Sequence, residues 1–101
     1  MIAVEHQIQK VRPGKWSALE EIEKKYAALE ARYGFPPKKR YQCMIGGPNT
    51  NALILDRQWA SLAAMEATYE KIMSDPEYQA LAAEIITIVE SQQIEVYTPL
   101  P

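Results

Sequence analysis

Hydrophobic and polar residues alternate at the start of the chain. The even positions hold Ile2, Val4, His6 and Ile8, and the odd positions between them include Glu5, Gln7 and Gln9. A period of two is typical of a β-strand, and here it predicts a strand over residues 2–11 with one apolar and one polar face. The turn-forming sequence Arg12-Pro13-Gly14 ends this segment.

The next segment, residues 15–33, changes to a helical period. Its larger apolar residues are spaced three or four apart, at Trp16, Leu19, Ile22, Tyr26, Leu29 and Tyr33. Glutamate and lysine fill most of the remaining positions, so the pattern predicts an amphipathic helix. Gly34 is placed to cap the carboxyl end of this helix.

Two short apolar runs follow, and they predict a β-hairpin. Phe35-Pro36-Pro37 favours extended backbone, because proline restricts its own conformation and that of the preceding residue. We expect strands over residues 40–45 and 51–56, joined through a turn at Gly46-Gly47-Pro48-Asn49.

The last third of the chain predicts a helix pair and a final strand. A second helix is expected to begin near Gln58 or Trp59 and to end before Ser74. Asp75 suits an N-cap and Pro76 the first helical position, so a third helix is expected from Pro76 to about Val89. Residues 93–98 alternate again and predict the last strand, which Pro99 ends.

The element order predicts an α+β fold of the ferredoxin-like, split βαβ type over a single domain, residues 1–101. In this fold two main helices cover one face of a four-stranded antiparallel sheet and leave the opposite face open. A second copy of the chain is the simplest cover, so we expect a homodimer. We expect the space between its two sheets to be lined by Gln7, Gln9, Gln42, Glu95 and Tyr97.

Composition narrows the classes of partner. The net charge is −2 and the isoelectric point is near 5.4, which argues against nucleic acid because that binding depends on neutralising phosphates. No apolar run approaches the roughly 20 residues of a membrane span, and the amino end lacks the layout of a signal peptide. The single Cys43 allows no internal disulfide, which suits a reducing cytosol. We therefore expect a cytoplasmic protein without a membrane partner.

His6 is the only histidine and therefore the default candidate for proton transfer. Because it shares its strand face with apolar residues, a structural role is the simpler interpretation. A metal site is not expected, since there is no second histidine or cysteine and no acidic cluster with calcium-loop spacing. We expect no cofactor either.

Three further features have both a structural and a functional interpretation. Lys38-Lys39-Arg40 is expected to be solvated where a strand begins, with anion binding as the alternative. Trp16 and Trp59 are each expected at the start of a helix, where large aromatic residues are typical of a core. The alternative is that they line an apolar ligand site.

Three stretches of the sequence resemble NIPSNAP-like proteins: residues 51–66, residues 73–79 and the closing residues 95–101. The resemblance implies a dimeric α+β barrel, a superfamily that also contains cofactor-independent monooxygenases of polycyclic aromatics, isomerases and haem-degrading enzymes. The haem-degrading members use a helical histidine, whereas His6 lies in the first predicted strand. Fold alone does not transfer an activity.

The preferred hypothesis is a homodimer that binds a small, partly apolar or aromatic molecule in a pocket between sheet and helices. The expected lining is drawn from His6, Trp16, Gln42, Trp59 and Tyr97. The enzyme alternative is a cofactor-independent monooxygenase or isomerase in which His6 or Glu95 assists proton transfer. The third interpretation is a structural or adaptor dimer with no enclosed pocket.

Overall fold

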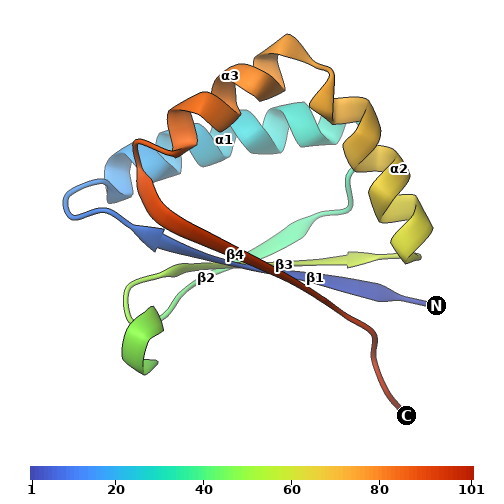
Figure 1. Ribbon diagram of the computed structural model, residues 1–101, viewed down its shortest axis with the longest axis horizontal. Helices are drawn as coiled ribbons and strands as arrows, with labels where there is room; N and C mark the ends of the chain where they lie inside the picture. Colours follow the sequence, from blue (N-terminus) through green and yellow to red (C-terminus); the bar gives the residue numbers. More distant parts are fainter.

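One antiparallel sheet of four strands, with helices on one face only, forms the computed structural model of residues 1–101 (Figure 1). The elements in chain order are β1 (Ala3–Val11), α1 (Trp16–Arg32), β2 (Lys38–Gln42), β3 (Leu53–Trp59), α2 (Leu62–Met73), α3 (Pro76–Ile85) and β4 (Val89–Tyr97). A short 3-10 turn, Gly47–Asn49, lies between β2 and β3. The predicted α+β, ferredoxin-like fold is confirmed.

The strand order is β2-β3-β1-β4, so β1 and β3 are central and β2 and β4 are edges. Figure 1 shows α1 and α3 lying together across one face of the sheet, with α2 at the end of the helix layer. The opposite face carries no helix and is called the open face below. No helix is long and apolar enough to cross a membrane.

Local sequence signals placed α1 and the start of α3 correctly. Leu19, Ile22 and Leu29 are buried on the core side of α1, as the spacing predicts. Gly34 follows the helix with a φ of 77°, a left-handed conformation that glycine adopts without strain. Asp75 is the N-cap of α3, and its carboxylate accepts a hydrogen bond from the backbone N–H of Glu77 at 2.7 Å.

The predicted start of the second helix at Gln58 or Trp59 is wrong, because β3 continues through Trp59. Trp59 pairs across the sheet with Ala3 and is 3% exposed. The helix begins only after Ser61, whose hydroxyl accepts a hydrogen bond from the backbone N–H of Ala64 at 3.0 Å. The three- or four-residue spacing of apolar residues in this helix continues back to Trp59, so the spacing alone does not show where the strand ends.

The predicted end of the third helix near Val89 and the start of the last strand at Gln93 are also wrong. Helix α3 ends at Ile85, and Val89 already pairs with Val11 of β1. The backbone N–H of Arg12 donates to the carbonyl of Ile88 at 2.9 Å, which ties the turn between them to the sheet. Pairing with β1 thus outweighs the helical spacing of these apolar residues.

The hairpin is shifted relative to the prediction. Strand β2 begins at Lys38 and ends at Gln42, and β3 begins at Leu53. The connection is closed by two backbone hydrogen bonds, in which the N–H of Cys43 and that of Asn51 donate to the carbonyls of Ala52 and Cys43. The apolar residues Met44 and Ile45, expected in the strand, are therefore exposed in the loop.

The polar face of β1, and not its apolar face, is turned toward the helices. Glu5 and Gln9 are buried under the helix layer, while the even-numbered residues lie on the open face. Gln42 lies on the helix side because it pairs with Leu53. The expectation that Gln7, Gln9 and Gln42 line an inter-sheet space is therefore wrong.

Glu95 and Tyr97, by contrast, lie on the open face with His6 and Val4, their cross-strand partners.

The hydrophobic core occupies the layer between the sheet and the helices. Its fully buried side chains are Leu19, Ile22, Leu29, Leu53 and Ile72. Phe35 and Trp59 pack edge to face with ring centroids 5.2 Å apart, and both also contact Tyr69. The aromatic cluster closes the end of the core beside α2.

Truncation of Ile72 tests this core, because the side chain is fully buried while the neighbouring Met73 is 60% exposed. Ile72→Ala is expected to lower the free energy of unfolding by about 2–5 kcal/mol, from lost burial and a residual cavity. The matched control Met73→Ala is expected to change it by about 0.5 kcal/mol or less. Urea unfolding measures both, and equal losses would contradict the placement of this helix face.

Candidate functional site

A cavity of about 240 Å³ lies between the helix layer and the covered face of the sheet. Its apolar wall is formed by Leu55, Ala82, Ile85, Ile86 and Ile94. The rest of the lining is polar and combines three kinds of group: paired ions, phenols and side-chain amides. Apolar surface beside convergent polar groups is typical of a small-molecule site.

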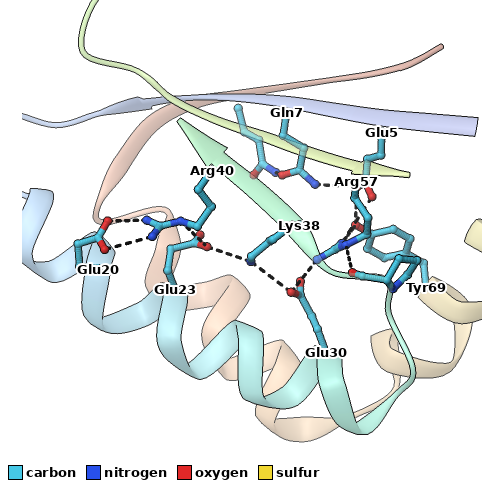
Figure 2. A network of polar contacts seen from close by, with 11 residues as sticks. Glu5, Gln7, Glu20, Glu23, Glu30, Lys38, Arg40, Arg57 and Tyr69 are labelled. Atoms are coloured by element: carbon cyan, nitrogen blue, oxygen red, sulfur yellow. Dashed lines mark hydrogen bonds and ion pairs between the residues drawn. The ribbon is translucent and has the colours of Figure 1, made fainter. Parts of the chain in front are cut away.

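The charged part of the lining is a chain of ion pairs of alternating sign (Figure 2). The guanidinium of Arg57 donates to Glu30 at 2.7 Å and lies 3.6 Å from Glu5. The ammonium of Lys38 lies 3.2 Å from Glu30 and 2.9 Å from Glu23. None of these side chains is more than 12% exposed. Each buried charge thus has an opposite partner, which offsets much of its desolvation penalty.

The chain of ion pairs continues to the surface through Arg40. Its guanidinium donates two hydrogen bonds to Glu20 and lies 3.7 Å from Glu23 (Figure 2). The hydrogen bond from Arg40 lowers the pKa of the Glu20 carboxyl. Lys38 and Arg40 lie two residues apart in β2 and point to the same side, toward α1. The prediction that this basic run is solvated is therefore wrong for Lys38, whose side chain is 11% exposed, and is confirmed for Lys39 and Arg40, which are exposed.

Glu5 is the centre of a hydrogen-bond cluster at the other end of the cavity. Its carboxylate accepts hydrogen bonds from the indole of Trp59 at 2.9 Å, from the phenol of Tyr69 and from the amide of Gln7 at 2.7 Å. Arg57 is held beside it, because its Nε donates to the carbonyl of Pro36 at 2.9 Å. The geometry of this end is therefore fixed by several contacts at once.

Two phenols of the lining remain free to bind a ligand. Tyr26 of α1 and Tyr78 of α3 meet edge to face, with ring centroids 5.9 Å apart. Burial raises the pKa of both phenols, as it does for Tyr69, so all three are protonated at neutral pH. Neither Tyr26 nor Tyr78 donates to a protein atom. The cavity therefore presents two available hydrogen-bond donors.

The floor of the cavity carries three glutamines. Gln92 of β4 donates to the side-chain carbonyl of Gln7 at 2.9 Å, and Gln7 in turn donates to Glu5. Gln9 is 5% exposed, and its Oε1 is buried without a hydrogen-bond partner. Gln7 and Gln9 thus differ: the first belongs to a connected network, and the second has an unused acceptor.

The five predicted site residues do not meet in one place, and none of them lines this cavity. His6 and Tyr97 lie together on the open face, with ring centroids 5.9 Å apart. Trp16 and Gln42 line a separate, shallower hollow at the β2 edge. Trp59 lies in the core and adjoins the cavity through Glu5, to which its indole donates, and through the ring of Tyr69.

His6 has an acidic partner that the sequence did not identify. Its Nδ1 lies 2.6 Å from Oδ1 of Asp56, the residue directly opposite it on β3. A carboxylate can only accept, so it holds the proton on Nδ1 and leaves Nε2 as the free base when the ring is neutral. Glu95 is the cross-strand neighbour on the other side, in β4.

Several cavity residues were missed in the sequence, although weak signals exist. Glu23 and Glu30 are seven residues apart and therefore share a helix face with Tyr26. Lys38 and Arg40 alternate with Lys39, so two cations of the run must share a strand face. Matching these two patterns would have predicted ion pairs between helix and strand. Nothing local pairs Glu5 with Arg57, because they are distant in sequence.

Most charged groups of the cavity already have partners within the protein. No group of three or more histidine, cysteine, aspartate or glutamate side chains is arranged to hold a metal ion. The carboxylates of the cavity are already engaged by cations, phenols or amides. What remains available is an apolar wall, two phenol donors and the Gln9 acceptor.

Solved structures with the same fold include NIPSNAP proteins. A NIPSNAP family protein from Agrobacterium tumefaciens superposes with a TM-score of 0.83 at 22% identity, covering 98% of this chain and 86% of that one. A NIPSNAP-like domain protein from Burkholderia xenovorans gives 0.83 at 17% identity, covering 98% and 85%. SnoaB, a cofactor-independent oxygenase from Streptomyces nogalater, gives 0.68 at 14% identity, covering 99% and 93%. At these identities the likeness concerns the fold.

Sequence comparison identifies the family. No curated protein matches the chain significantly. The sequence model of the NIPSNAP family, however, matches residues 5–101. This match confirms the resemblance seen in the sequence, and because it spans nearly the whole chain, the protein belongs to the NIPSNAP family.

Proposed function

We propose that this NIPSNAP protein binds a small, partly apolar molecule in the cavity between sheet and helices. The observation that carries the proposal is the combination of an apolar wall with polar groups that have no partner within the protein. Such a combination provides both burial and orientation for a ligand. A purely structural dimer has no need of such a cavity.

The size of the cavity limits the ligand. Pockets for drug-sized molecules have volumes of about 300–1,000 Å³, and this one has about 240 Å³. A one- or two-ring molecule, or one of similar bulk, is therefore the expected occupant. The predicted residues His6, Trp16, Gln42, Trp59 and Tyr97 are not the lining of this proposed site.

Filling the cavity tests the proposal directly. Ala82 and its neighbour Ala83 are both exposed, but only Ala82 lines the cavity. With naphthol as a two-ring probe, Ala82→Trp is expected to weaken binding at least about tenfold, because the new indole occupies ligand volume. Ala83→Trp serves as the matched control and is expected to bind as the parent does.

Isothermal titration calorimetry measures the binding, and thermal unfolding confirms that both variants are folded. Equal affinities for the two variants, or no binding of naphthol and related two-ring compounds to the parent protein, would refute the proposed site.

We also propose that two copies associate through their open faces to form a dimeric α+β barrel. Val4, Ile8 and Ile54 share this face through their cross-strand pairing, and Tyr41 beside them is half exposed. The same face carries both signs of charge, with Lys39 paired opposite Asp56. A surface with an apolar centre and charges of both signs is complementary to a second copy of itself.

Solution mass tests the dimer. The parent chain is expected at twice its monomer mass of 11.5 kDa in light scattering. Ile8→Glu, which places a charge at the centre of the open face, is expected to shift the population to monomer. Leu62→Glu is the control, because Leu62 is 50% exposed on α2, in the helix layer. A monomeric parent, or a dimer unchanged by Ile8→Glu, would count against the proposal.

The second candidate function is proton transfer by His6 in a cofactor-independent oxygenase or isomerase. It is favoured by the short contact between Nδ1 of His6 and Asp56, which orients the ring and leaves Nε2 as a base. Glu95 and Tyr97 adjoin the ring on the same face. The oxygenase SnoaB shares the fold.

Oxygen uptake with a polycyclic phenol tests the oxygenase form of this candidate. The parent is expected to show oxygen uptake, and His6→Gln is expected to reduce the rate about a hundredfold or more, because the base is lost. Glu70→Gln, at an exposed position on α2 in the helix layer, is the control variant. An unchanged rate in His6→Gln would remove the histidine from the reaction.

A further inference from the structure

The unused acceptor of Gln9 specifies a property of the ligand. Gln9 lies on the central strand β1, lines the cavity and is 5% exposed. Its Oε1 is buried and accepts no hydrogen bond from the protein. A buried polar atom without a partner costs about 1–3 kcal/mol, so nearly all such atoms in folded proteins are satisfied. A hydrogen-bond donor from outside the chain would remove this cost.

No other atom of the lining shows the same deficit. Oε2 of Glu23 also lacks a well-aligned hydrogen bond, but it lies 2.9 Å from the ammonium of Lys38 and its charge is therefore compensated. Gln7, two residues from Gln9 on the same side of the strand, uses both ends of its amide. The deficit is thus specific to Gln9, which lines the cavity.

The ion pairs argue that the ligand is uncharged. Glu5, Glu23 and Glu30 are matched by Lys38 and Arg57, with Arg40 beside Glu23. A carboxylate or ammonium on the ligand would have to displace one of these partners or stay unpaired in a buried site. Either outcome carries a large desolvation penalty. A neutral polar group avoids it.

The phenols on the opposite wall complete the recognition. Tyr26 and Tyr78 are protonated donors without protein partners, and they face a floor on which Gln9 is an acceptor. A hydroxyl is the small neutral group that both donates and accepts. We infer that the ligand is an uncharged, largely apolar molecule whose hydroxyl donates to Oε1 of Gln9. This inference rests on the proposed ligand site and deepens it.

Four probes of similar shape separate the chemical classes. Naphthol carries the hydroxyl, methylnaphthalene replaces it by a methyl group, and naphthoate and naphthylmethylammonium carry opposite charges. In calorimetry with the full chain, naphthol is expected to bind at least about tenfold more tightly than methylnaphthalene, because only the hydroxyl satisfies the buried acceptor. The two ions are expected to bind more weakly than either neutral compound.

The variant Gln9→Met assigns the effect to the amide. It keeps the length of the side chain and removes the acceptor, so the advantage of naphthol over methylnaphthalene is expected to fall to about twofold or less. The thermal midpoint is expected to stay or rise, because an unsatisfied buried group is lost. Gln58→Met, at an exposed position on the open face, is the control and should keep the full preference.

The failures of the two proposals give different results. If methylnaphthalene binds as tightly as naphthol and Ala82→Trp weakens both, the cavity is a ligand site and the hydroxyl inference is wrong. Tighter binding of either ion than of naphthol, or a preference that survives Gln9→Met, also overturns the inference. If none of the four probes binds, the proposed site fails and the inference fails with it.

Discussion

Charge compensation between the sheet and the helix layer is the constraint on which the structure depends. Three carboxylates, Glu5, Glu23 and Glu30, are buried in the layer that normally holds only apolar side chains. They are stable there because Arg57 and Lys38 lie within ion-pair distance. Removing one partner would leave a buried charge alone, which costs more than the pair itself contributes. The positions of β1, β2, β3 and α1 relative to one another must therefore be kept.

The same constraint explains how a cavity persists in so small a core. Side chains held by several polar contacts cannot collapse into neighbouring space as aliphatic side chains do. Glu5 alone accepts hydrogen bonds from Trp59, Tyr69 and Gln7 and lies beside Arg57. The ions thus form the frame of the site, and the groups left for recognition are the neutral ones, the phenols and Gln9.

Strand β1 turns its polar face, and not its apolar face, toward the helices. Because Glu5 and Gln9 face the helices, the apolar residues Val4 and Ile8 of the same strand must face away from them. Apolar residues at the centre of an outer face are a liability for an isolated chain of this size and an advantage for one that pairs with a copy of itself. His6 lies among these residues, so its contact with Asp56 belongs to the outer face and not to the cavity.

The sequence by itself determined the elements whose signals are local. The helical period of α1, the capping signals Asp75 and Pro76, and the element order were enough to predict a ferredoxin-like fold. Only the tertiary structure decided which strand face is covered, where β3 and β4 begin and end, and which side chains form the cavity. The physical reason is that a lone buried glutamate is unfavourable and a paired one is not, and the partner of Glu5 is Arg57, on another strand. The hydrophobic periodicity of one segment gives no information about ion pairs that form between two segments.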